Sequence, residues 1–408
     1  MPSNVYFPHS SKKNVKNINK YVILSLIQFT SGGISRAELA RQLGLSRSAV
    51  TIIINDLMAN GLIRESAKKT GASGRPRTLL EITPEAGYVT GIDMGAKHLR
   101  IAIANFGAHV ILEKEIPFDI GAPPLVCLQK TDDLLRDLLA EAHLNLNEIT
   151  AIGLGVPGPI SSDAGMVIAP PIMPGWDKFP IRETLEEMWN LPVSVNNDAE
   201  LGALGEWAYG AGRDANDLAY IKVGTGIGAG LLIDGRIYRG STGSAGEIGH
   251  LTIDTDGPIC TCGNRGCLEA LSGGRAIALQ ARKKIQEKEN TQLRKISLEN
   301  ITAKDVAFVA QRGDLIAQQI MEKAGENLGI AIAGLINIIN PDMVIVGGGV
   351  AQTGDLLLEP IRETVKKRSV LAVATEVRIT TALLGRRSTS MGAVAQALTS
   401  ALHLIAKK

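Results

Sequence analysis

Three cysteines and one histidine lie close together in the second half of the chain, in a pattern suited to binding a metal ion. Cys260, Cys262 and Cys267 fall within eight residues, and His250 precedes Cys260 by ten. Three thiolates and one imidazole match the closed tetrahedral sites of structural zinc. A lone histidine is usually an ordinary core or surface residue, and we interpret Cys127 and the other five histidines in that way. The pattern predicts a structural Zn²⁺ ion and indicates no open catalytic metal position.

A second group with chemical potential is the carboxylate of Asp198. It follows Asn197, between a predicted strand at 191–196 and a predicted helix at 199–207. An aspartate at the start of a helix is most often a cap. An aspartate that follows a strand and faces a ligand also has the position of a general base for a hydroxyl group. The residues themselves leave both interpretations open.

Glycines cluster at the ends of predicted strands, where α/β folds bind ligands. Without a side chain, their backbone amides can approach a phosphate or a sugar closely. One such turn is weak support, but four indicate a single site assembled from several segments. The clusters are Gly91 and Gly95; Gly153, Gly155 and Gly158; Gly224, Gly226, Gly228 and Gly230; and 347–349. Zinc would also fix the loops that carry Glu247 and Glu269, whose carboxylates suit sugar hydroxyls.

The elements expected to position these groups alternate between strands and helices from residue 88 onward. Such alternation, with apolar strands, predicts α/β layers. We expect strands at 88–94, 99–105, 110–116, 149–153, 193–195, 218–223 and 229–233, and a helix at 128–142.

The first 60 residues have a different pattern, which predicts three helices at 14–29, 36–43 and 47–60. Ser35 and Glu38 form a capping box, Gly44 ends the second helix and Ser46 caps the third. This spacing predicts a helix-turn-helix whose last helix enters the major groove of DNA. The residues expected to meet DNA at the start of that helix are Ser46, Arg47, Ser48 and Thr51.

A wing is expected to follow, with short strands at 62–65 and 78–82 around a cationic loop. Arg75 and Arg77 flank Pro76, so this stretch is stiff, extended and suited to a minor groove or a phosphate backbone. A solvated loop can carry such charges without binding anything, and a helix pair can bind protein. The coincidence of charge, caps, turn and wing favours DNA.

The charge distribution supports this division of the chain. Twelve basic and three acidic residues give residues 1–80 a net charge of +9, whereas the remainder, with 31 basic and 38 acidic residues, nets −7. A basic head on an acidic body points to a polyanion partner. No apolar run reaches the length of a membrane span, no signal peptide is apparent, and four cysteines are too few for a disulfide scaffold. We therefore expect a cytoplasmic, multidomain protein without membrane insertion.

These motifs resemble the ROK family (repressors, open reading frames and kinases), specifically its transcriptional-repressor branch. The likeness extends over nearly the whole chain. It rests on the helix-turn-helix with Gly74-Arg75-Pro76, on the cysteine segment, and on five further motifs at 152–159, 196–203, 223–230, 246–250 and 344–350.

The resemblance implies an N-terminal winged helix-turn-helix followed by an α/β actin-like body of two lobes, of the sugar-kinase or ribonuclease H-like kind. The expected domains are residues 1–85 for DNA binding, 86–196 plus 386–408 for the first lobe, and 197–385 for the second lobe with the zinc site and the dimerisation surface. The implied sugar ligands, in a cleft between the lobes, are Gly158, Asn197, Asp198, Glu247, His250 and Glu269. His250 would bind zinc through one nitrogen and a sugar hydroxyl through the other.

The chain departs from the family's kinases in the first phosphate loop. The kinases have Asp-x-Gly-Gly-Thr-Lys there, whereas this chain has Ala96 in place of the second glycine and Lys97 in place of the threonine. A methyl group then crowds the phosphate, and a hydroxyl donor is lost. We expect the loops to be vestigial, at Asp93, Gly95, Gly224, Thr225 and Gly226, and we expect no ATP as cofactor.

The leading functional hypothesis is a sugar-responsive transcriptional repressor of carbohydrate-metabolism genes. It would bind operator DNA as a homodimer, or as a tetramer, and respond to a sugar or a sugar phosphate. Regulation by a protein partner stays open. The alternative is an ATP-dependent sugar kinase that retains a DNA-binding head, with Asp198 as the catalytic base. A constitutive DNA-binding protein is opposed by the polar set at Glu247, His250 and Glu269, because unliganded converging polar groups are costly.

Overall fold

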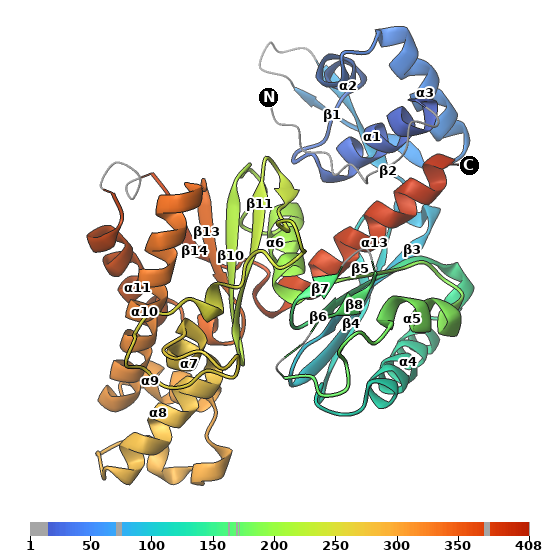
Figure 1. Ribbon diagram of the computed structural model, residues 1–408. Helices are drawn as coiled ribbons and strands as arrows, with labels where there is room; N and C mark the ends of the chain where they lie inside the picture. Colours follow the sequence, from blue (N-terminus) through green and yellow to red (C-terminus); the bar gives the residue numbers. More distant parts are fainter. Residues whose placement is uncertain are drawn as a thin grey trace.

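Three helices and a two-stranded hairpin form the head of the protein in the computed structural model, which describes residues 15–70, 76–161, 164–168, 170, 172–370 and 376–407 (Figure 1). The elements are α1 (Val15–Phe29), α2 (Arg36–Leu43), α3 (Arg47–Ala59), β1 (Ile63–Thr70) and β2 (Pro76–Ile82). The two strands pair antiparallel, and Ile34 adds a single bridge to Leu80. The predicted winged helix-turn-helix is therefore present, with longer wing strands than expected.

The predicted caps position these helices. Ser35 and Glu38 form the capping box of α2, each side chain bonding the other residue's backbone. Gly44 ends α2 in the left-handed conformation at φ 63°, where a side chain would be strained. Ser46 accepts a hydrogen bond from the Ala49 amide and begins α3.

The body contains two five-stranded sheets with the same strand order. The first is β5-β4-β3-β6-β9 and the second is β12-β11-β10-β13-β14. In each, three strands are antiparallel neighbours and the last two run parallel to the middle one. This repeated topology confirms the predicted two-lobed α/β body.

The seven predicted strands of the body are present to within a few residues, whereas β7, β8, β12, β13 and β14 were not predicted. The first sheet consists of β3 (Tyr88–Met94), β4 (His98–Asn105), β5 (Val110–Pro117), β6 (Ile149–Val156) and β9 (Val193–Asn197). The second consists of β10 (Leu218–Val223), β11 (Ile227–Ile233), β12 (Arg236–Ile237), β13 (Met343–Gly347) and β14 (Arg378–Thr381). A small hairpin, β7 (Ile160–Ser161) and β8 (Met166–Val167), lies outside both sheets.

The two faces of the first sheet carry side chains of different size and pack against different helices. Ile101 and Ile103 of β4 pack into one core with α4 (Pro124–Glu141) and α5 (Ile181–Trp189). Ala102 and Ala104, on the opposite face, pack against α13 (Ser388–Lys407). Helix α6 (Asp198–Tyr209) packs against α13. In the part of the chain that the structure describes, five helices cover the second sheet: α7 (Leu268–Ser272), α8 (Gly274–Gln286), α9 (Ala303–Gln311), α10 (Leu315–Ile339) and α11 (Asp355–Arg368).

Helix α13 connects the parts of the molecule (Figure 1). Its first half lies so close to its neighbours that a Cβ at Gly153 would stand 2.1 Å from the Ala393 carbonyl oxygen. Its second half contributes Leu398 and Leu402 to the same apolar core as Leu24 and Leu57 of the head. The C-terminal helix therefore belongs to the body at one end and to the head at the other.

Within the described residues, no helix has the length and apolar character needed to cross a membrane. The domain boundaries expected at 86, 197 and 386 stay predictions.

Candidate functional site

The four predicted metal ligands converge in the loop before α7. The ligand atoms of His250, Cys260, Cys262 and Cys267 all lie within 4.8 Å of one another. The Sγ atoms of Cys262 and Cys267 are 3.7 Å apart, and Cys260 Sγ is 3.6 Å from His250 Nδ1. Bonds of about 2.3 Å to sulfur and 2.0–2.1 Å to nitrogen give tetrahedral ligand separations of about 3.6–3.8 Å. The set therefore fits a tetrahedral ion such as zinc.

Asn197, and not Asp198, caps helix α6. The Asn197 side chain accepts hydrogen bonds from the Ala199 and Glu200 amides at 2.8 and 3.2 Å. Its Nδ2 donates to the Gly158 carbonyl at 2.9 Å, which ties α6 to the turn after β6. Asp198 is the first residue of the helix, and its carboxylate is free of the capping role that the sequence left open.

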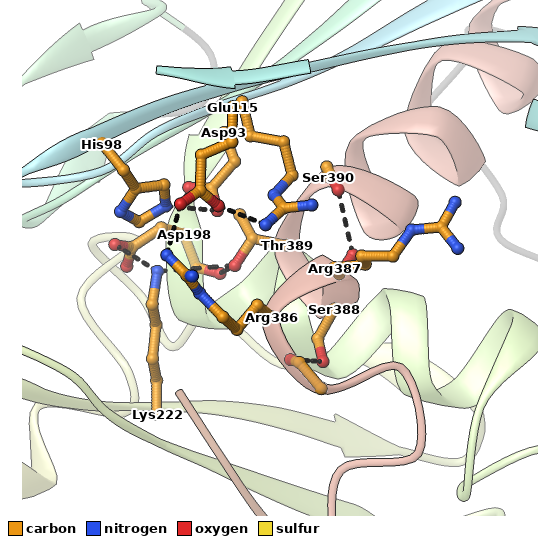
Figure 2. A network of polar contacts seen from close by, with 12 residues as sticks. Asp93, His98, Glu115, Asp198, Lys222, Arg386, Arg387, Ser388, Thr389 and Ser390 are labelled. Atoms are coloured by element: carbon orange, nitrogen blue, oxygen red, sulfur yellow. Dashed lines mark hydrogen bonds and ion pairs between the residues drawn. The ribbon is translucent and has the colours of Figure 1, made fainter. Parts of the chain in front are cut away.

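The Asp198 carboxylate instead pairs with Lys222, near the end of β10 (Figure 2). Lys222 Nζ lies 2.8 Å from Asp198 Oδ2 and 3.4 Å from the hydroxyl of Thr389, the second residue of α13. Burial lowers the pKa of Lys222, but the negative charges of Asp198 and Asp93 outweigh it and raise that pKa above its usual range. A carboxylate paired with an ammonium ion can still accept a hydrogen bond from a hydroxyl group.

Glu247 and Glu269, the two predicted sugar carboxylates, come from segments that follow β11 in the chain. Burial raises the pKa of Glu247; His250 opposes this shift, while the charges of Asp198 and Glu269 add to it. His250 Nε2 lies 3.8 Å from Glu247, so its Nδ1 faces the cysteines and its other nitrogen faces the carboxylate. Glu269 Oε2 accepts a hydrogen bond from the Ile227 amide at 2.9 Å. Glu247 therefore lies near His250 and Asp198, and Glu269 lies close enough for its charge to act on Glu247.

The first predicted phosphate loop is occupied by the protein's own side chains. His98 Nε2 lies 3.0 Å from Asp93 Oδ2, and a Cβ at Gly95 would meet the His98 ring at 2.3 Å. The imidazole thus covers the glycine that a phosphate would approach. Lys97 points to Asp119, 2.9 Å away on the surface, and Ala96 packs against the core of the first lobe.

Asp93 itself is buried at the centre of this region. Burial disfavours its charge, yet Lys222, His98 and Arg100 together hold the pKa of its carboxyl below the ordinary value. Its Oδ1 atom has no hydrogen-bond partner among the described residues.

In the second phosphate loop, between β10 and β11, no side chain of a described residue covers Gly224 as His98 covers Gly95 in the first loop. The Gly224 amide donates to the Gly226 carbonyl at 2.9 Å, and Thr225 is exposed. A Cβ at Gly226 would stand 2.2 Å from Glu269, so the loop lies against the candidate sugar site.

The segment that enters α13 is held by buried and half-buried carboxylates. Glu206 of α6 is fully buried and accepts hydrogen bonds from the Leu383 and Leu384 amides and the Ser388 hydroxyl at 3.0, 2.9 and 2.7 Å. Arg386 pairs with Glu115 of β5 (Figure 2). The start of α13 is thereby fixed to both lobes next to the Asp198–Lys222 pair.

The predicted DNA-binding residues of α3 lie together on its exposed side. Ser46, Arg47, Ser48 and Thr51 are all exposed. Arg75 lies outside the described residues, and of Arg77 only its backbone place in β2 is described.

Sequence reasoning missed Lys222, His98, Thr389 and Glu206, which surround the predicted site. Lys222 lies in an otherwise apolar strand, where a lysine ordinarily marks a solvated position. The local signal that could have found it is a lysine in an apolar strand, two residues before the glycine-rich turn that begins at Gly224. The other three come together only through the packing of distant segments.

Comparison with known proteins agrees with this arrangement. A model of the ROK family matches residues 89–400, and a model of winged helix-turn-helix DNA-binding domains matches residues 16–64. A xylose repressor of Caldicellulosiruptor bescii is 34% identical over 391 residues, which cover 95% of this chain and 97% of that protein.

Two solved structures show the same fold. A ROK family transcriptional regulator described as a homologue of the Escherichia coli MLC protein superposes with a TM-score of 0.80 at 28% identity, covering 96% of this chain and 98% of that one. A ROK family glucokinase from Streptomyces griseus, in complex with glucose and AMPPNP, gives a TM-score of 0.68 at 28% identity and covers 76% of this chain and 99% of that one.

Proposed function

The chain belongs to the ROK family, and from this premise we propose that it is a sugar-responsive transcriptional repressor. The winged helix-turn-helix binds operator DNA, and a sugar binds where Asn197, Asp198, Glu247 and Glu269 converge. The observation that carries the proposal is the union of a DNA-binding head with a sugar-kinase-like body in one chain, over nearly its whole length. The similarity to the xylose repressor extends over 95% of this chain and 97% of that protein.

Zinc has a supporting role in this proposal. His250, Cys260, Cys262 and Cys267 hold the ion, which fixes the loops of Glu247 and Glu269. Because His250 turns its other nitrogen toward Glu247, the metal also orients the sugar-facing side of the imidazole. The ion is structural, since four protein ligands leave no open position.

Sugar-dependent release of DNA tests the proposal. Fluorescence anisotropy of the full chain on DNA taken from upstream of its own gene measures operator affinity, first alone and then with xylose, glucose, N-acetylglucosamine, allose and their phosphates. Typical coupling free energies predict a loss of affinity of about 5- to 150-fold with the right sugar. A sugar acts in this way only if it binds the DNA-free state more tightly.

The matched control is Glu269→Gln, which keeps the shape of the side chain but removes a charge from the sugar site. We expect it to bind DNA with unchanged affinity and to lose the response to the sugar. If none of these ligands changes DNA affinity several-fold, the proposal that one of these sugars controls DNA binding is wrong. Absence of any specific DNA binding would contradict the repressor function.

Phosphoryl transfer is the less favoured function. Asp198 has the position of a base, and the Streptomyces griseus relative is a glucokinase. Against transfer stand the Lys222–Asp198 ion pair and the His98 ring over Gly95. A coupled assay of ADP release, with ATP and each sugar, tests whether the protein transfers a phosphoryl group. Turnover that Asp198→Asn abolishes would favour the kinase.

A further inference from the structure

One apolar side chain on α3 has no use in the fold. Ile52 is 67% exposed, whereas Ile54 and Leu57 of the same helix are buried. Ile52 is four residues after Ser48 and three before Asn55, so these three side chains share the outward line of the helix. This line is the centre of the surface that a helix-turn-helix presents to the major groove.

Folding gives no reason for isoleucine at this position. A β-branched residue loses side-chain freedom in a helix and is a weaker helix former than alanine or lysine. A buried position compensates for this through packing, as Ile54 does, but an exposed one does not. An isoleucine at position 52 therefore weakens α3 slightly in the free protein and gains only when another surface covers it.

The polar side chains around Ile52 already have partners within the head. Thr51 donates its hydroxyl to the Arg47 carbonyl at 2.8 Å, and the hydroxyls of Ser46 and Ser48 are 3.0 Å apart. Arg36 donates to Asn55 at 2.9 Å. For these groups to form hydrogen bonds with DNA bases, they would have to give up their present partners within the head.

The same surroundings favour DNA as the covering surface. Asp56, an acidic residue of α3, pairs with Lys20 of α1 at 2.8 Å, which offsets the charge that would repel phosphates. Arg47 is exposed at the first position of the helix. An apolar side chain in such a cationic, hydroxyl-rich surface matches one feature of the major groove, the 5-methyl group of thymine.

We propose that Ile52 determines sequence specificity by packing against the 5-methyl group of a thymine in each operator half-site. This inference rests on the proposed function and adds the kind of base pair that the centre of α3 reads. No other base carries a methyl group in that groove. The contact distinguishes T·A from the other base pairs without using a hydrogen bond.

The test begins with selection of binding sites from a random pool of duplex DNA by the full chain. Wild type, Ile52→Ala and Ile52→Val are each put through the selection, with Ile338→Ala as the matched control, because Ile338 is an 84% exposed isoleucine of α10 outside the head. We expect one thymine per half-site whose preference is lost in Ile52→Ala and kept in Ile52→Val and Ile338→Ala. Alanine is a better helix former than isoleucine, so Ile52→Ala should unfold at no lower temperature than wild type.

Replacing that thymine by deoxyuridine removes only the methyl group. Burial of about one methyl group predicts a loss of about fourfold in wild-type affinity for each half-site. Ile52→Ala should be insensitive to the same replacement.

The possible results are distinct. If wild type selects no sequence, the proposed function itself fails, and the inference falls with it. If wild type selects a site whose logo is unchanged in Ile52→Ala, or whose affinity is unchanged by deoxyuridine at every thymine, the function stands and the thymine contact is wrong.

Discussion

The role of the Asp198 carboxylate depends on the residues beside it, Asn197 and Lys222. Its sequence position allowed a cap or a base, but Asn197 is the cap and the carboxylate forms an ion pair with Lys222. What remains is a fixed anionic acceptor beside Glu247, with the Lys222 ammonium within reach of Thr389. Such a carboxylate binds a hydroxyl group without needing to remove its proton.

We expect Lys222→Met to destabilise the protein, because it leaves Asp198 without its counter-ion; both side chains are only 15% exposed. Removing one partner of a buried pair costs about 3–5 kcal/mol, so the melting temperature should fall by several degrees. Adding Asp198→Asn to Lys222→Met should recover much of the loss. Thermal unfolding of both single variants and the double variant measures the coupling, and additive losses would show that the pair is not coupled.

The metal centre gives a second prediction at this scale. We expect about one zinc ion per purified chain, measured by elemental analysis, and a large loss of metal in Cys262→Ser, since one of four ligands is gone. Cys262 is exposed, so the change leaves no cavity. Removal of the metal should lower the affinity for sugar, because the loops of Glu247 and Glu269 lose their common anchor. Cys127→Ser, which alters a buried cysteine of α4, should keep its zinc, and equal metal contents in the two variants would contradict this ligand set.

At the scale of elements, local signals in the sequence predicted helix boundaries in the head. Ser35, Gly44 and Ser46 predicted the ends of α2 and α3. The start of α4 was wrong by four residues, because the helix begins at Pro124, and a proline in the first turn was not considered. Lys222, His98 and Thr389 were missed because their contacts depend on how the lobes pack. No pattern within a single segment contains that information.

Two helical glycines should respond to alanine in opposite directions. A Cβ at Gly392 of α13 would stand 1.7 Å from the Leu201 carbonyl oxygen of α6, whereas at Gly334 of α10 it would meet nothing within 4 Å. We expect Gly392→Ala to destabilise by about 3 kcal/mol or more through overpacking, and Gly334→Ala to stabilise by about 0.5–1 kcal/mol through helix propensity. Urea unfolding of the two variants measures both. If both variants changed the free energy of unfolding by the same amount, α6 and α13 would have to move apart at little cost to accommodate the new methyl group.

At the scale of the whole molecule, α13 is the element that reaches both candidate sites. Its second residue, Thr389, donates a hydrogen bond to the Asp198 carbonyl at 3.0 Å. Its distal half shares the core of the head, where His403 stands edge-on to Tyr21 of α1 with ring centroids 5.3 Å apart. We therefore expect a sugar that changes the Asp198–Lys222 pair to act on the start of a helix whose other end supports the DNA-binding helices.

His403→Ala tests this coupling by weakening only the distal contact. His403 is partly buried and Tyr21 is a buried residue of α1, which carries none of the predicted DNA-binding residues, so DNA affinity without sugar should change little. Sugar affinity should also persist, because the Asp198 region is untouched. The sugar-induced loss of DNA affinity should then fall at least several-fold below the wild-type ratio, measured by anisotropy with and without the effective sugar. The control is His143→Asn, an exposed histidine with φ 56° that asparagine tolerates. A wild-type ratio in His403→Ala would mean that the signal reaches the head without the Tyr21–His403 contact.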